Sequence, residues 1–155
     1  MVVGKYLANI KFKSKFKKFI VSNLGILDLH THMRTVPLMK YAQENRRNID
    51  GKNIVEIGCG NGKNCFEVYY IANPKHIVGF DFDTNAIESA NKLSNELKVE
   101  NQVQFFCENA TKYDFSNIGN IDYLLLIDFL EHIDRPDLFL QFIKPLLNDT
   151  STIIV

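Results

Sequence analysis

Three glycines at alternate positions could bind a ligand through the backbone. Gly58, Gly60 and Gly62 follow a β-branched run, and Glu56 precedes the first of them by two residues. Glycine tolerates a positive φ and lets a ligand approach the backbone closely, and free N–H groups at the start of a following helix attract polar ligands. The dinucleotide fingerprint G-x-G-x-x-G needs a glycine at position 63, where Lys63 stands. The shifted glycine argues against a bound pyrophosphate.

An acid at the end of the next apolar run points to a nucleoside. Asp81 follows the last glycine of the loop by 19 residues. A carboxylate at this place can accept hydrogen bonds from both ribose hydroxyls, as it does in dinucleotide-binding folds. Together, the loop and the acid predict an adenosine-type ligand. The alternatives are a tight strand-to-helix turn that binds nothing and, for Asp81 alone, a solvated strand end.

The third candidate feature is a group of ionisable side chains in the segment D-F-L-E-H, residues 128–132. Asp128, Glu131 and His132 are spaced i, i+3 and i+4, so they share one face if the segment is helical. Histidine titrates near neutral pH and can act as a general base, which favours a base or a residue that positions the substrate. The same side chains could instead bind a divalent cation, or His132 could simply cap or pack. We expect no metal.

Alternating apolar runs and helical stretches must hold these side chains together. They predict strands at 53–58, 76–81, 102–107, 121–127 and 151–155, and helices at 34–48, 62–72, 84–98 and from 134 onward. Thr84 is the expected N-cap of its helix, and Pro136 suits a first-turn position. Strands that alternate with helices are typical of an α/β fold with a doubly wound, mostly parallel sheet.

The order of the motifs resembles that of class I S-adenosylmethionine-dependent methyltransferases, which have a Rossmann-like sheet. The resemblance covers about residues 51 to 155 and rests on Glu56 with its glycines, on the segment G-F-D-F-D at 79–83 and on E-N-A at 108–110. It implies S-adenosyl-L-methionine as the cofactor. Glu56 and the glycine loop would lie along the methionine part, Asp81 would hold the ribose and Phe82 would lie against the adenine.

Asn109 departs from the family, which usually has an aspartate facing the adenine amino group. The carbonyl oxygen of asparagine can still accept that hydrogen bond. The cofactor-binding residues that the resemblance implies are Glu56, Gly58, Cys59, Gly60, Gly62, Asp81, Phe82, Asn109, Ala110 and Asp128.

The D-F-L-E-H segment is similar to the D-x-L-E-H stretch of ubiquinone-type O-methyltransferases. That similarity implies Asp128 and His132 as catalytic residues and a small-molecule acceptor, a hydroxyl before an amine. A related E-x-x-E-H pattern holds a metal in small-RNA 2′-O-methyltransferases, so transfer to RNA is one alternative. A cofactor-binding subunit that is inactive or needs a partner chain is another. The family has seven strands and five can be placed, so we expect a core that is truncated after the fifth strand.

The net charge of zero hides a strong asymmetry. Residues 1–27 contain six lysines and no acid, whereas residues 28–155 hold 12 basic and 18 acidic side chains. Helical spacing predicts an amphipathic helix over 5–22, within a helical lid segment at 1–50 that precedes the cofactor-binding core at 51–155. This helix could lie on an anionic membrane surface, but we favour a helix docked over the pocket with solvated lysines. Nucleic acid is disfavoured because the segment has no arginine.

The remaining features of the sequence bound where the chain acts. No apolar stretch approaches the ~20 residues of a membrane-spanning helix, no signal-peptide pattern opens the chain, and the three cysteines lack metal-type spacing. We therefore expect a cytoplasmic protein that could form homo-oligomers. His30 and His32 are expected to be structural rather than to contact the substrate.

Overall fold

The computed structural model describes residues 29–113, 115 and 118–155. The predicted helix at 5–22, with its membrane or pocket contacts, lies outside the described residues. The chain divides into two compact units, Met1–Pro37 and Leu38–Val155, and each is described by itself. In the first unit the described backbone, residues 29–37, is the first part of the helix α3 (Leu29–Glu44), whose remaining residues are counted in the second unit. The side chains of His30 and His32, within that helix, lie outside the described residues.

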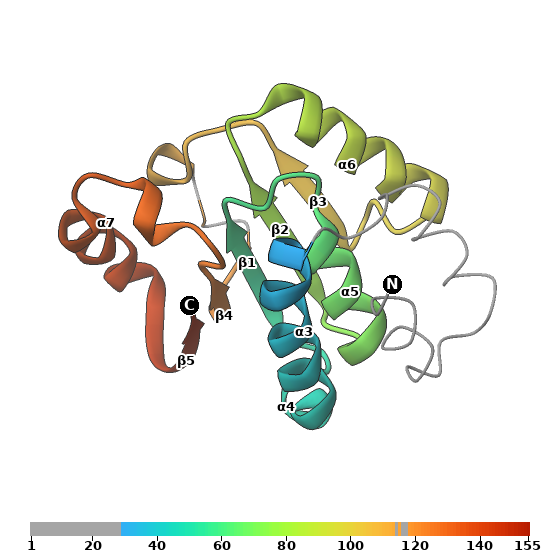
Figure 1. Cartoon of the computed structure of the whole chain (residues 1–155). Helices are drawn as coiled ribbons and strands as arrows, with labels where there is room; N and C mark the ends of the chain where they lie inside the picture. Colours follow the sequence, from blue (N-terminus) through green and yellow to red (C-terminus); the bar gives the residue numbers. More distant parts are fainter. Residues whose placement is uncertain (1–28, 114, 116–117) are drawn as a thin grey trace. The chain divides into compact units, whose positions relative to one another are not determined.

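A parallel sheet with the strand order β3-β2-β1-β4-β5 forms the centre of the second unit (Figure 1). Each neighbouring pair runs in parallel, which confirms the predicted doubly wound α/β fold. The central strands are apolar and largely buried because both faces of the sheet are covered. The strands are β1 (Asn53–Ile57), β2 (His76–Phe80), β3 (Val103–Phe106), β4 (Ile121–Leu125) and β5 (Leu147–Ile154).

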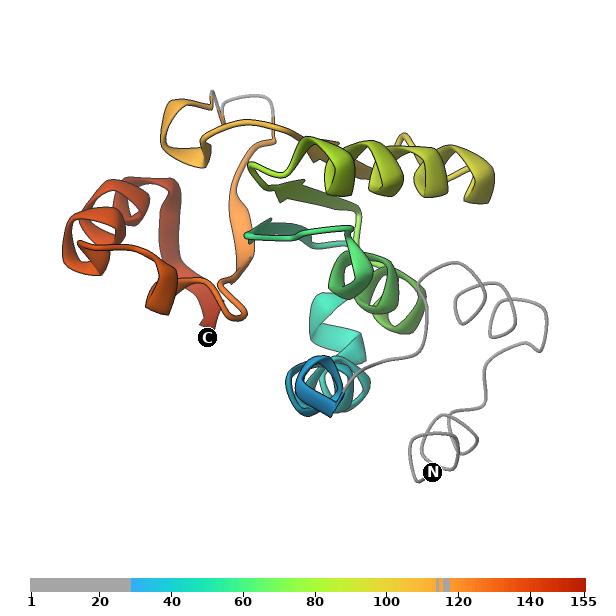
Figure 2. The same cartoon turned by 45° about the horizontal axis from the view of Figure 1, so that its top comes forward.

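Helices cover both faces of the sheet (Figure 2). The helices α5 (Lys63–Ala72) and α6 (Thr84–Leu97) pack on one face, and α7 (Pro136–Ile143) lies on the other. Alternate residues of a strand point to opposite faces. Val55 therefore joins the apolar core beneath α7, whereas its neighbour Glu56 points to α5.

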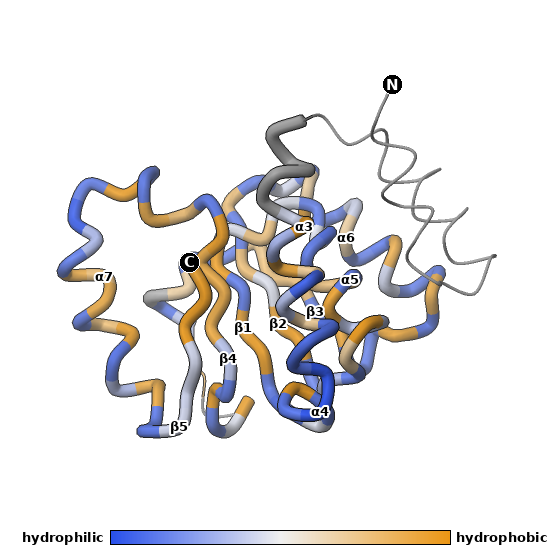
Figure 3. The backbone as a smooth tube through the Cα atoms, turned by 60° about the horizontal axis from the view of Figure 1, so that its bottom comes forward, coloured by the Kyte–Doolittle hydropathy of each residue, from blue (hydrophilic) through white to orange (hydrophobic). Residues whose placement is uncertain are grey.

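Short helical segments connect these elements: α4 (Arg46–Ile49), η1 (Ala110–Lys112), η3 (Leu130–His132) and η4 (Lys144–Leu146). Figure 3 shows hydrophobic residues concentrated in the strands, whereas α4 is strongly hydrophilic. Within the described ranges, no helix is long and apolar enough to cross a membrane.

The prediction of Thr84 as an N-cap is wrong, because Asp83 caps α6. One carboxylate oxygen of Asp83 accepts the N–H groups of Asn85 and Ala86 at 2.9 and 3.1 Å. Thr84 is the first residue of the helix, and its hydroxyl lies 3.3 Å from the sulfur of Cys107. Pro136 does occupy the first turn of α7, as predicted.

Two elements differ from the predictions by more than two residues at a boundary. The strand β5 begins at Leu147 rather than at residue 151, because Leu147 pairs with Ile121 before an irregularity in the register. The polar residues at 148–151 hide this part of the strand from an apolar pattern. The predicted helix at 34–48 begins earlier, at Leu29, and is interrupted at Asn45, which separates α3 from α4.

Candidate functional site

The glycine loop joins β1 to α5 with a backbone that glycine adopts far more easily than other residues. Gly58, Gly60 and Gly62 have φ angles of +78°, +53° and +76°, in the left-handed region that side chains disfavour. The ring of Phe105 also occupies the place of a Cβ on Gly62. At Gly60, by contrast, no atom lies within 4 Å of that place. The backbone of Gly60 is therefore open to a ligand.

Asp81 ties this loop to the end of β2. One carboxylate oxygen accepts the N–H of Gly60 at 2.7 Å, and the other accepts the N–H of Asp83 at 2.9 Å. The backbone of the loop is tied to the same strand, because the N–H groups of Gly58 and Cys59 donate to the carbonyl of Phe80 at 2.8 and 3.1 Å. Carboxylate oxygens have further lone-pair directions, so Asp81 can still accept hydrogen bonds from a ligand.

Glu56 lies beneath the loop rather than in the open. Its side chain is completely buried, and its two oxygens accept hydrogen bonds from Asn64 Nδ2 at 2.8 Å and Cys65 Sγ at 2.9 Å. Burial raises the pKa of this carboxyl to about 7, against the smaller lowering effect of the two hydrogen bonds. Glu56 thus fastens the end of β1 to the first turn of α5.

Cys59 turns its side chain away from the open side of the loop. A Cβ built on Gly79 would lie 2.7 Å from the Cys59 sulfur, so the thiol packs over the neighbouring strand. Burial, with help from the nearby carboxylates of Glu56 and Asp81, raises the pKa of this thiol far above its usual range. A neutral, buried thiol is a small packing group and not a nucleophile.

A cavity of about 640 Å³ lies at the carboxyl edge of the sheet, which is where open α/β sheets bind ligands. It brings together most of the predicted site residues from the ends of β1, β2, β3 and β4. The predicted residues that line it are Gly58, Asp81, Phe82, Asn109, Ala110, Asp128 and His132. Glu56, Cys59, Gly60 and Gly62 belong to the loop and its support and do not line the cavity.

Phe82 is the most exposed phenylalanine in the cavity wall, with 71% of its surface accessible. A large apolar side chain this open can stack on a planar ligand. Asn109 and Ala110 lie at the start of η1, where the carbonyl of Asn109 accepts the N–H of Lys112 at 2.8 Å.

The α7 side of the cavity is one that the sequence motifs did not indicate. It is formed by Arg135, Leu138, Phe139 and Phe142, together with Phe129 and Ile133. Leu138 and Phe142 are 50% and 41% exposed and are spaced i, i+4 on one helix face. That spacing is the feature of the sequence from which this wall of the cavity could have been predicted. Arg135 forms an ion pair with Asp137 through Nε and a terminal nitrogen at 2.9 and 2.6 Å, so its charge is offset.

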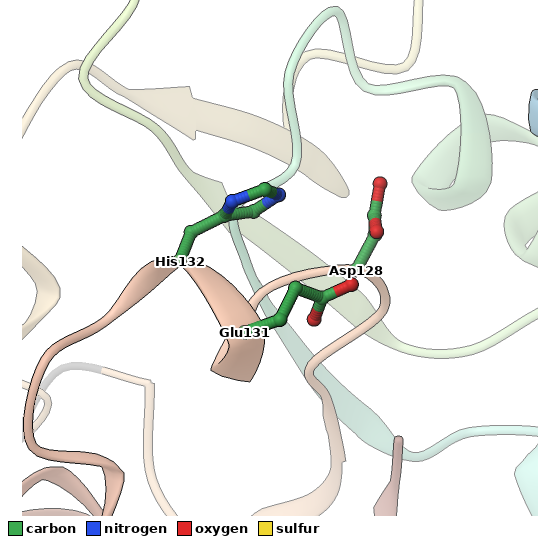
Figure 4. A group of neighbouring side chains, drawn as sticks. All are labelled: Asp128, Glu131 and His132. Atoms are coloured by element: carbon green, nitrogen blue, oxygen red, sulfur yellow. The ribbon is translucent and has the colours of Figure 1, made fainter.

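Asp128, Glu131 and His132 gather at the same edge, with one potential ligand atom of each within 4.8 Å of the others. Figure 4 shows the Glu131 carboxylate directed toward Asp128, with the His132 imidazole beside them. The three side chains therefore lie close together, but not on the face of one helix, because η3 covers only Leu130–His132 and Asp128 precedes it in a turn. Asp128 is half-buried, whereas Glu131 and His132 are exposed. Such a group can take up a proton, polarise a substrate or coordinate a cation.

Asp128 holds a strained backbone, with a φ of +58°. Aspartate is one of the few residues that enter the left-handed region at modest cost, and such conformations cluster at functional sites. The turn places Asp128 three residues after the end of β4 and two residues before η3.

Comparison with known proteins places these features in one family. The family model described as "Methyltransferase domain" matches residues 48–155, which include the sheet, the glycine loop and the whole cavity. Among curated proteins, N-methyltransferase 4 of Papaver somniferum is 28% identical over 109 residues, which make up 68% of this chain and 29% of that protein. The chain spans less than half the length of the curated relatives it matches.

Solved structures share the fold. A putative caffeoyl-CoA O-methyltransferase from Staphylococcus aureus superposes with a TM-score of 0.66 at 22% identity, over 96% of this chain and 70% of that one. Coclaurine N-methyltransferase bound to N-methylheliamine and SAH gives a TM-score of 0.63 at 18% identity, over 77% and 34% of the two chains. The Rossmann-like methyltransferase fold and the family match agree, and the chain belongs to the methyltransferase domain family.

Proposed function

We propose that the chain is an S-adenosylmethionine-dependent methyltransferase that transfers a methyl group to a hydroxyl of a small molecule. One observation carries the proposal. A single cavity collects a ribose-type acid, an exposed aromatic ring, an amide and a carboxylate–imidazole group from four strand ends. The similarity to coclaurine N-methyltransferase bound to SAH, which we interpret as S-adenosylhomocysteine, supports this choice of cofactor.

The residues present fit the cofactor. Asp81 has free acceptor capacity for the ribose hydroxyls, Phe82 offers its face to the adenine, and Asn109 with Ala110 borders the same region. The open backbone at Gly60 would take the methionine part, within the loop that includes Gly58, Cys59 and Gly62 and that Glu56 supports from below. When bound, S-adenosylmethionine supplies an electrophilic methyl group on its sulfonium.

His132 is the proposed base, and Asp128 its companion in the acceptor site. An imidazole at neutral pH can accept the proton of an attacking hydroxyl. The carboxylates of Asp128 and Glu131 lie beside the imidazole, with one potential ligand atom of each residue within 4.8 Å of the others. Apolar side chains form much of the cavity wall, and such a lining disfavours water next to the transferred group. On this basis we also propose membership of the ubiquinone-type O-methyltransferase subgroup.

A second candidate acceptor is an amine. It is favoured by the similarity to N-methyltransferase 4 of Papaver somniferum and by the carboxylates of Asp128 and Glu131 beside the cavity, which attract a cationic amine before it loses its proton. Methyl transfer from the labelled cofactor to catechol and to tetrahydroisoquinoline distinguishes the two acceptors.

Calorimetry with S-adenosylmethionine and S-adenosylhomocysteine tests the cofactor site. We expect micromolar binding that weakens by about tenfold or more in Asp81→Asn, since the variant loses a charged acceptor. The matched control is Glu88→Gln, which makes the same charge change at an exposed position on α6. Absence of heat from the folded, unaltered chain overturns the proposal. Binding without transfer to either acceptor would instead indicate a non-catalytic or partner-dependent subunit.

A further inference from the structure

Phe129 contacts three parts of the site at once. Its ring lies against Gly58, because a Cβ on that glycine would be 2.9 Å from Cδ2 and 3.5 Å from Cγ of Phe129. The centroid of the same ring lies 5.1 Å from that of Phe139 on α7. The backbone carbonyl of Phe129 accepts the N–H of His132 at 3.0 Å. One residue therefore joins the glycine loop, the proposed base and the helix that lines one side of the cavity.

The contact between Phe129 and Gly58 is close. Gly58 leaves room for the ring only because it has no side chain, in addition to its φ of +78°. An aromatic ring has few rotatable bonds, so a ring packed between Gly58 and Phe139 holds its own backbone in place. The strained residue Asp128 directly precedes it. Such strain persists only where the surroundings enforce it, and this ring is part of those surroundings.

We propose that Phe129 is a positioning residue for methyl transfer, which by packing on Gly58 fixes the Asp128–His132 segment relative to the cofactor loop. The inference rests on the proposed function. Transfer needs the reacting atoms about 3–3.5 Å apart, and a misplacement of about 1 Å can cost about 10²-fold in rate. Phe129 carries no group that takes part in the chemistry. Its contribution is to hold the donor side and the acceptor side of the cavity at one separation.

The test compares three variants of the full chain. Phe129→Leu removes the ring and Phe129→Tyr keeps it. Phe115→Leu is the matched control, because Phe115 is buried in the same core and does not line the cavity. Two quantities are measured: the affinity for S-adenosylhomocysteine by calorimetry, and the change that saturating S-adenosylhomocysteine causes in the NMR signals of the His132 imidazole. His132→Gln assigns those signals.

We expect Phe129→Leu to weaken binding by about tenfold and to lose most of the response of His132, even when it is saturated with ligand. Phe129→Tyr, which keeps the ring, should retain both the affinity and the response of His132. Phe115→Leu lowers the melting temperature but keeps the response of His132. If the role of Phe129 were purely structural, Phe129→Leu would also leave the response of His132 unchanged. If Phe129→Leu does not fold, Phe129→Met replaces it, because methionine fills the volume without a rigid ring.

Normal affinity and a normal His132 response in the folded leucine or methionine variant overturn the inference and leave the proposed cofactor site standing. An unaltered chain that binds no S-adenosylhomocysteine overturns the proposed function and this inference together.

Discussion

Glu56 and Cys65 lie in contact beneath the glycine loop, with the thiol sulfur 2.9 Å from a carboxylate oxygen and neither side chain exposed. The contact joins the end of β1 to the first turn of α5, and so braces the loop between them. A carboxyl group shut away from water holds its proton tightly, and the pKa of Glu56 is accordingly raised to about 7, chiefly by burial.

Stability is expected to fall as pH rises from about 4.5 to about 7. The folded chain retains the Glu56 proton in this window, whereas the unfolded chain, with the ordinary pKa of 4.5, releases it. Because the folded state binds more protons, the free energy of unfolding declines with rising pH. Glu56→Gln removes this contribution. As the pH rises from about 4.5 to about 7, the free energy of unfolding of the unaltered chain should therefore fall by up to about 3 kcal/mol more than that of the variant. Urea unfolding at a series of pH values measures it.

Glu67→Gln on α5 is a second test of the same effect. Burial also raises the pKa of Glu67 to about 7, with a smaller opposing effect from Lys63, so its contribution has the same sign and window. The double variant should have the flattest pH dependence of the set. If the free energy of unfolding depends on pH in the same way in Glu56→Gln and in the unaltered chain, the pKa of Glu56 is not raised in the folded state.

Substitution of two glycines by alanine should separate binding from folding. Gly60→Ala meets only the conformational cost of a positive φ, about 1–2 kcal/mol, because nothing lies near the new Cβ. It should fold and yet lose most of its affinity for S-adenosylhomocysteine, since the methyl group occupies the open side of the loop. Gly62→Ala pays the same cost and also displaces the ring of Phe105, so its melting temperature should fall further. Equal binding by Gly60→Ala and the unaltered chain in calorimetry would be evidence against the loop as a ligand site.

Much of the sheet and of the placement of the site residues could be predicted from the sequence, because short local patterns of residues indicate both. The β-branched run before Gly58 and the run before Asp81 indicate parallel strands, and parallel strands bring their carboxyl ends to one edge. That rule alone places Gly58, Asp81 and Asp128 together, as the cavity shows.

What could not be predicted depends on side-chain geometry and on contacts distant in sequence. Asp83 and Thr84 are both good capping residues, and only the start of α6 decides between them. The α7 wall of the cavity depends on where that helix lies relative to β1. Phe129 and Gly58 follow two different strands, β4 and β1, and no local sequence pattern predicts that they lie in contact.

The N-cap of α6 gives a local stability prediction. Asp83 satisfies two backbone N–H groups at the start of the helix, so Asp83→Ala should lower the free energy of unfolding by about 1 kcal/mol. Thr84→Ala is the matched control: it changes the next residue and should cost a few tenths at most, since its hydroxyl caps no N–H and alanine is a better helix former. Urea unfolding measures both. A larger loss in Thr84→Ala would show that the threonine is the cap.

Two variants of Asp128 should isolate the strain in the turn after β4. Asp128→Gly and Asp128→Ala both remove the carboxylate, so they differ only in how readily the backbone adopts a φ of +58°. Glycine enters this region freely, whereas for alanine it costs about 1 kcal/mol or more. We therefore expect Asp128→Gly to be about 1 kcal/mol more stable than Asp128→Ala in urea unfolding, while both lose methyl transfer to the same extent. Equal stabilities would mean that the turn relaxes when the carboxylate is removed, and that the side chain itself holds the backbone in its left-handed conformation.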